Sequence, residues 1–128
     1  MLTNKMLASK ILTYTFFVFL MCIGSDKIFQ SNFITDWQGL VGPVVSFLLP
    51  IGAGSVVMLE GAVEIILGIS LLTRWKTTGL VILVITIAII TIDLFILGDS
   101  NLAIREIILM LICYVMYLLD ERTPELMT

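Results

Sequence analysis

The sequence predicts an all-α integral membrane protein, a four-transmembrane-helix bundle that forms one domain over residues 1–128. The composition is the first observation behind this prediction: the chain is 59% hydrophobic and 13% charged, and its mean hydropathy is +1.13. A soluble domain is about half apolar and about one quarter charged, so this chain needs lipid to cover its surface. The second observation is the length of its apolar segments. Four of them approach the roughly 20 residues that cross a bilayer core about 30 Å thick.

The predicted helices cover residues 7–24, 52–72, 79–97 and 102–119. The first follows two lysines in the manner of a signal peptide, but its apolar run is long enough to favour a retained helix. Residues 25–51 keep aromatic and aliphatic side chains at near-helical spacing among polar neighbours. We therefore expect an interfacial or re-entrant segment between helices 1 and 2. Residues 120–128 form a short acidic tail.

The distribution of basic residues predicts the orientation of the bundle, because positive charge gathers on the cytoplasmic side of membrane proteins. The side that holds both termini and the link between helices 2 and 3 contains Lys5, Lys10, Arg74, Lys76 and Arg122. The opposite side contains Lys27 among acidic residues. We expect a multi-pass protein of the inner (plasma) membrane, with both termini and the tail in the cytoplasm.

Charged residues inside the apolar segments are the main functional signal. Glu60 and Glu64 lie four residues apart in "VVMLEGAVEIILG", and therefore share a face of helix 2. Because successive helices alternate in direction, charges from all four helices reach the outer half of the membrane, with Glu64 somewhat deeper. The candidate binding or proton-site residues are Lys27, Glu60, Glu64, Asp93, Arg105 and Glu106.

These charges are expected to face the bundle interior and to pair, since a charge at the bilayer centre costs about 2.5–3.5 kcal/mol. Four carboxylates face only two cations, and one carboxylate has no obvious cationic partner. We expect that to be Glu64, in its neutral form and without an ionic partner. Such a group suits a proton relay, a hydrogen bond to a quinone carbonyl, or a site for a cationic substrate. The alternative is purely structural: Arg105 bridges Glu60 and Asp93, and Lys27 closes the cluster from above.

Several function classes are excluded by composition. The chain contains no histidine and has a net charge of −3. Nucleic-acid binding needs clustered basic residues, which this chain lacks. Without histidine or a cysteine motif we expect no metal site, and the sequence holds no ligand set for haem, flavin or an iron–sulfur cluster. A complete oxidoreductase formed by this chain alone is not expected, and no covalently bound cofactor is predicted.

Three motifs together resemble the DoxX-like family of small four-helix membrane proteins. They are "GSDKIF" at the end of helix 1, "LEGAVEIILGISLLTRW" in helix 2 and "NLAIREIILML" at the start of helix 4. The resemblance spans roughly residues 7–119. It implies a four-helix bundle with both ends in the cytoplasm, and a link to redox or oxidative-stress enzymes. It puts Lys27, Glu60, Glu64 and Arg105 at the functional site, whereas Asp93 comes from the helix geometry alone.

The sequence leaves three functions open. The first is a DoxX-like membrane subunit of a redox-associated assembly, with a quinone or small-molecule site and a soluble or membrane oxidoreductase as partner. The second is a small proton-coupled transporter that uses Glu64 and Glu60. The third is a membrane scaffold without catalytic activity. Contact with the lipid bilayer is common to all three, and a homo-oligomer is compatible with each.

Overall fold

The fold is an all-helical bundle in the computed structural model, which describes residues 3–31 and 33–119. Its long helices are α1 (Asn4–Phe29), α3 (Ala53–Ser70), α4 (Lys76–Ile96) and α5 (Ser100–Leu119). A 3₁₀ turn η1 (Trp37–Leu40) and a short helix α2 (Pro43–Leu48) lie between α1 and α3. The four long helices are each long and apolar enough to cross a membrane. The predicted fold class, a four-helix bundle of membrane-spanning length, is confirmed.

Helix α1 extends beyond the apolar stretch that predicted it, at both ends. Its start is capped by Thr3, whose hydroxyl oxygen accepts a hydrogen bond from the amide of Met6 at 3.1 Å. Its end is set by Gln30, which adopts a left-handed conformation with φ 50°. Lys27 therefore lies in the last helical turn and not beyond the helix. The ends of the other three long helices differ from the predicted ends by at most a few residues. The predicted tail, 120–128 with Arg122, lies outside the described residues.

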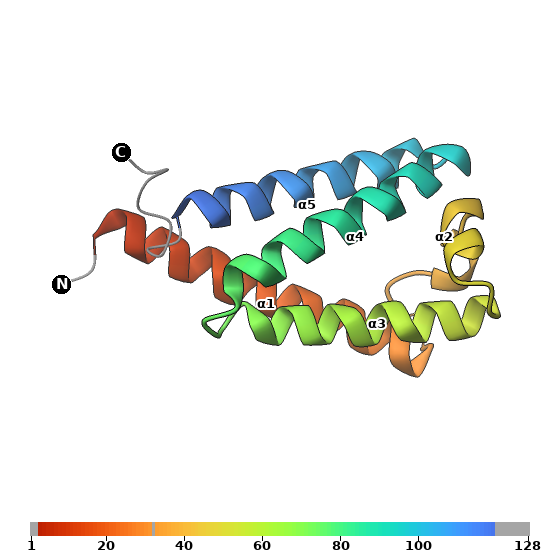
Figure 1. Cartoon of the computed structure of the whole chain (residues 1–128), viewed down its shortest axis with the longest axis horizontal. Helices are drawn as coiled ribbons and strands as arrows, with labels where there is room; N and C mark the ends of the chain where they lie inside the picture. Colours follow the sequence, from red (N-terminus) through yellow and green to blue (C-terminus); the bar gives the residue numbers. More distant parts are fainter. Residues whose placement is uncertain (1–2, 32, 120–128) are drawn as a thin grey trace.

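The bundle consists of two closely packed helix pairs, α1 with α3 and α4 with α5 (Figure 1). The start of α1 and the end of α5 lie at the same end of the molecule as the α3–α4 link (Figure 1). Glycines bring α1 and α3 together: a Cβ atom on Gly24 would lie 2.8 Å from the carbonyl oxygen of Gly61. Small residues at helix crossings let backbones approach in this way.

The end of the bundle near the α3–α4 link is filled by side chains. A cluster of buried apolar residues joins all four long helices there: Phe16, Leu20, Leu67, Leu71, Leu80, Leu83, Ile87, Cys113 and Met116. Lys76, which the sequence placed in the link between helices 2 and 3, is also buried at this end. Its ammonium group donates to Thr13 Oγ1 at 2.7 Å and to Ser9 Oγ at 3.4 Å, which ties α4 to α1.

The segment between α1 and α3 closes the opposite end of the bundle (Figure 1). Asp26 organises its first part, because its carboxylate accepts hydrogen bonds from the amides of Phe33 and Ile34 at 2.9 and 3.1 Å. The same carboxylate accepts from the indole of Trp37 at 2.6 Å. Helix α2 then packs against α4. The segment is therefore held to the bundle by polar contacts, which its amphipathic sequence pattern did not predict.

The close crossing of α1 and α3 predicts that Gly24→Ala destabilises the fold. The added methyl group would lie 2.8 Å from the Gly61 carbonyl and 2.7 Å from Ile65 Cγ1, so backbone must shift. Overpacking of this kind costs about 1–3 kcal/mol. We expect a lower midpoint of thermal unfolding in detergent, followed by circular dichroism. Gly39→Ala is the matched control, because a Cβ atom there makes only ordinary contact with Asp36, at 3.5 Å from its Oδ2 atom. Equal midpoints for the two variants would contradict this account of the crossing.

Candidate functional site

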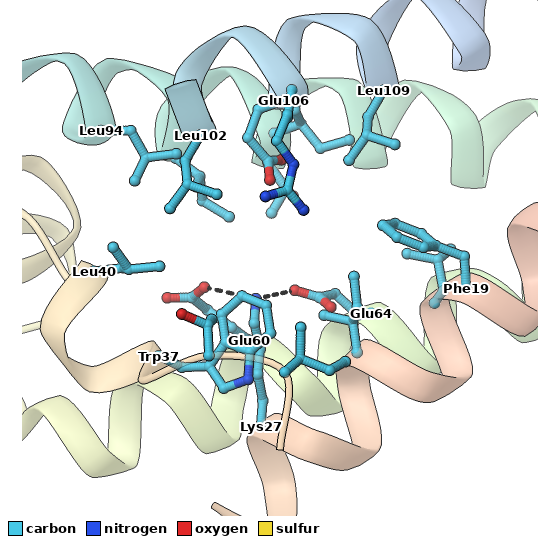
Figure 2. A pocket seen from close by; sticks show the side chains of 18 of the residues that line it. Phe19, Lys27, Trp37, Leu40, Glu60, Glu64, Leu94, Leu102, Glu106 and Leu109 are labelled. Carbon is cyan, nitrogen blue, oxygen red and sulfur yellow. Dashed lines mark hydrogen bonds and ion pairs between the residues drawn. The ribbon is translucent and has the colours of Figure 1, made fainter. Parts of the chain in front are cut away.

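A cavity of about 490 Å³ lies between the two helix pairs, next to η1 and α2 (Figure 2). Most of its wall is aliphatic or aromatic, from Phe16, Phe19, Leu20, Ile23, Leu40, Val45, Leu83, Ile87, Ile90, Leu94, Leu102, Ile108 and Leu109. Its polar groups come from Lys27, Thr35, Trp37, Glu60, Glu64, Thr86, Asp93, Arg105 and Glu106. All six residues predicted from the sequence therefore line one cavity. Pockets for small molecules have this combination of size, apolar wall and a few polar groups.

Lys27 is the central charge of the cavity. It is only 5% exposed, and its ammonium group forms ion pairs with Glu64 Oε1 and, at 3.3 Å, with Glu60 Oε2. Figure 2 shows the ammonium between the two carboxylates. The same nitrogen lies 4.7 Å from the centre of the Trp37 ring, which adds a cation–π contact. One lysine from α1 thus holds two carboxylates from α3.

The local sequence explains why these groups meet. Glu60 and Glu64 are one helical turn apart and project from the same face of α3. Gly61 lies between them, and a Cβ atom there would be 2.9 Å from Lys27 Cβ. The missing side chain therefore makes room for Lys27 to lie directly against α3. A larger residue at position 61 would hold the lysine away from both carboxylates.

Glu64 has an ionic partner, contrary to the sequence-based expectation. The excess of carboxylates led us to expect Glu64 to be neutral and without an ionic partner, whereas its Oε1 atom pairs with Lys27. The residue is 7% exposed. Its other oxygen, Oε2, is buried and accepts no hydrogen bond from the described residues. A buried acceptor without a donor is rare in folded proteins and requires an explanation.

Arg105 and Glu106 come from α5 and lie on the wall opposite the lysine. Figure 2 shows Glu106 across the cavity from Lys27, Glu60 and Glu64. Arg105 is exposed and makes no ion pair with any described residue. The structural alternative, in which Arg105 bridges Glu60 and Asp93, is therefore not what the fold contains. The guanidinium group remains available at the cavity wall.

Asp93 has a structural partner within the chain. Its carboxylate oxygens accept hydrogen bonds from the amides of Val44 at 2.7 Å and Val45 at 2.8 Å, in the first turn of α2. An acidic side chain at a helix N-terminus satisfies amides that lack a partner within the helix. Gly42 permits this approach, since a Cβ atom there would be 2.6 Å from Asp93 Cβ. Asp93 thus attaches α2 to α4 beside the cavity.

Two residues of the site escaped the sequence analysis as site residues. Trp37 belongs to the segment that the sequence predicted to be interfacial or re-entrant, but it packs on Lys27 and donates to Asp26. Asp26 precedes Lys27 directly, and its carboxylate receives four hydrogen bonds from the following loop. The available signal was an acidic residue at a helix end followed by a polar loop, a pattern that favours side-chain capping of backbone amides.

The cavity opens between α1 and α5. The exposed residues of its wall are Phe19 and Cys22 on α1, Ile34 in the loop, and Arg105 and Ile108 on α5. The wall residues on α3 and α4 are buried or half-buried. In a bilayer, this opening faces the lipid along the sides of α1 and α5.

The described residues contain no group of three or more His, Cys, Asp or Glu side chains arranged to hold a metal ion. Comparison with known proteins adds no assignment: no family model, curated protein or solved structure matches this chain. The candidate site therefore rests on its own geometry.

The Lys27 ion pairs predict that Lys27→Met is strongly destabilising. Removal of the cation leaves the buried Glu64 and the half-buried Glu60 carboxylates without compensation, and breaking a buried pair in this way costs about 3–5 kcal/mol. We expect unfolding at a lower denaturant concentration in mixed micelles. The triple variant Lys27→Met/Glu60→Gln/Glu64→Gln removes the uncompensated charge. We expect it to regain most of the free energy of unfolding that Lys27→Met loses. A single variant as stable as the wild type would show that the ion pairs contribute nothing to the fold.

The contact between Asp93 and α2 predicts a local effect of Asp93→Ala. Loss of the acceptor leaves the Val44 and Val45 amides without a partner, at about 1–3 kcal/mol for each buried group. We expect faster hydrogen–deuterium exchange across residues 43–48, with exchange in the four long helices unchanged. Asp36→Ala, which removes an exposed acid from the same loop, is the control. Identical exchange in the two variants would argue against the attachment of α2 by Asp93.

Proposed function

We propose that this chain binds an amphipathic small molecule of the quinone class in the cavity between its helix pairs. In this proposal it is the membrane subunit of an assembly linked to redox chemistry or oxidative stress. The observation that supports the proposal is the cavity, about 490 Å³ in volume, with an apolar wall and a buried polar end. A quinone has the matching form, because a small polar ring is joined to an apolar tail.

The position of the opening supports a ligand that comes from the bilayer. A lipid-soluble molecule can reach the cavity between α1 and α5 without crossing water. Its ring would lie near Lys27, Glu64 and Arg105, and its tail would follow the aliphatic wall toward the lipid. Charged residues within membrane-spanning helices are expensive, and in such positions they commonly mark a functional site.

The resemblance to the DoxX-like family supports the wider assignment. It suggests a location in the inner (plasma) membrane, with both termini in the cytoplasm. The basic residues Lys5, Lys10 and Arg74 favour the same orientation. Redox cofactors would then belong to a partner oxidoreductase, while this chain would hold the lipid-soluble ligand.

Proton-coupled transport is the second candidate, and one observation favours it. Glu60 and Glu64 share a single lysine inside the cavity, so a proton or a cationic substrate could compete with Lys27 for either carboxylate. The quinone proposal accounts better for the aliphatic wall and its opening toward lipid.

Blocking the cavity is expected to remove the ligand. Protein purified gently from its native membrane should carry quinone in near-stoichiometric amount, measured by solvent extraction and chromatography. Ile90→Trp places a large ring in the cavity wall and should reduce bound quinone at least about tenfold, since a filled pocket excludes the ring. Ile92→Trp, on the exposed face of the same helix, should retain it.

Absence of quinone from the wild-type preparation would count against the proposal. If proteoliposomes of the same protein then moved protons, and Glu64→Gln abolished that flux, the assignment would pass to transport. Equal quinone content in Ile90→Trp and Ile92→Trp would show that the molecule binds outside this cavity.

A further inference from the structure

The buried Oε2 atom of Glu64 indicates which hydrogen-bonding group a ligand of the cavity must carry. It belongs to Glu64, a side chain that lines the cavity and is more than nine-tenths buried, and it has no donor among the described residues. A carboxylate oxygen only accepts hydrogen bonds. A ligand that satisfies it must therefore carry a donor, such as a hydroxyl group.

Lys27 is largely engaged by the protein itself. Its ammonium group has three donors. Two are directed to Glu60 and Glu64, and the nitrogen also lies over the ring of Trp37. The third donor has no hydrogen-bond acceptor among the described residues, and it could donate to the oxygen of a carbonyl or of a hydroxyl, so Lys27 does not discriminate between them. The most buried cation of the site is thus already engaged by the protein.

The remaining charges favour a donor in the same way. Glu60 and Glu64 lie with Lys27 on one wall of the cavity and Glu106 lies with Arg105 on the other, while the Asp93 carboxylate is occupied by the α2 amides. The cavity therefore contains more acceptor than donor capacity. Arg105 can donate to the oxygen of a carbonyl or of a hydroxyl, so it does not discriminate between them. Glu64 Oε2 does discriminate, because a carbonyl oxygen beside it would place two acceptors in contact.

We propose that the cavity selects the hydroquinone form over the quinone, with a phenolic O–H donating to Glu64 Oε2. This inference rests on the proposed function, and it adds which redox state the site retains. Preferential binding of the reduced form also raises the midpoint potential of the bound couple, by about 30 mV for each tenfold difference in affinity. The site would then hold a reduced carrier until a partner oxidises it.

The test is anaerobic titration calorimetry of the full chain in lipid nanodiscs with three probes. They are a short-chain ubiquinol, the corresponding ubiquinone, and the dimethyl ether of the quinol, which has the same ring but no O–H donor. We expect the quinol to bind about ten to one hundred times more tightly than either of the others, the range expected for a hydrogen bond to a charged group.

Glu64→Gln is the diagnostic variant, because its amide can offer Lys27 an oxygen and the cavity an N–H donor. We expect it to lose the preference for quinol or to reverse it. Asp36→Asn, outside the cavity, should keep the wild-type preference. The dimethyl ether supplies the same information on the wild-type protein if Glu64→Gln does not fold.

The outcomes separate the two proposals. Equal affinities for the quinol, the quinone and the ether would overturn the selection of the reduced form and leave the quinone site in place. A Glu64→Gln variant that folds and still prefers quinol would assign the selection to another group, and would also refute this inference. Failure of all three probes to bind would refute the quinone site itself.

Discussion

The burial of Lys27 against Glu60 and Glu64 is the interaction on which the rest of the site depends. A charge inside an apolar bundle is stable only when it is paired and hydrogen-bonded. The lysine meets this condition with two carboxylates from the neighbouring helix and the ring of Trp37. Trp37 in turn donates to Asp26, which arranges the loop after α1. The ion pairs therefore join α1 to α3 and also position the chain that closes this end of the bundle.

One end of the bundle is filled by side chains and the other contains a cavity, because different residues lie between the helix pairs at the two ends. Near the α3–α4 link, aliphatic and aromatic side chains fill the space between the helix pairs. At the other end, α1 and α3 are tied to each other through Lys27, while α4 and α5 form the opposite wall (Figure 2). Helix α2, held by Asp93, lies beside the space that remains. The cavity thus lies where the polar contacts run within each half of the bundle and do not bridge the two halves.

This arrangement also explains why the polar end of the cavity is rich in acceptors. Lys27 is shared by two glutamates, so one carboxylate oxygen remains without a donor. Burying that oxygen has a cost that the fold does not offset on its own. A ligand with a hydroxyl group would offset it, and the aliphatic wall would hold the remainder of the molecule. Binding and selectivity would then arise from the same imbalance between acceptors and donors.

The sequence by itself determined the four helices and the set of polar residues that meet between them. Hydropathy, helix length and the four-residue spacing of Glu60 and Glu64 are local properties, and alternating helix direction brings charges to one depth. Only the tertiary structure decided which of these charges pair. Glu64 receives Lys27, contrary to the expectation from the sequence. Asp93 caps α2 and Arg105 stays without an ionic partner among the described residues, so the bridge of the structural alternative does not form. The pairing depends on how closely the helices approach one another, which here is set by Gly24, Gly42 and Gly61. Distances of this kind cannot be obtained by counting charges along the sequence.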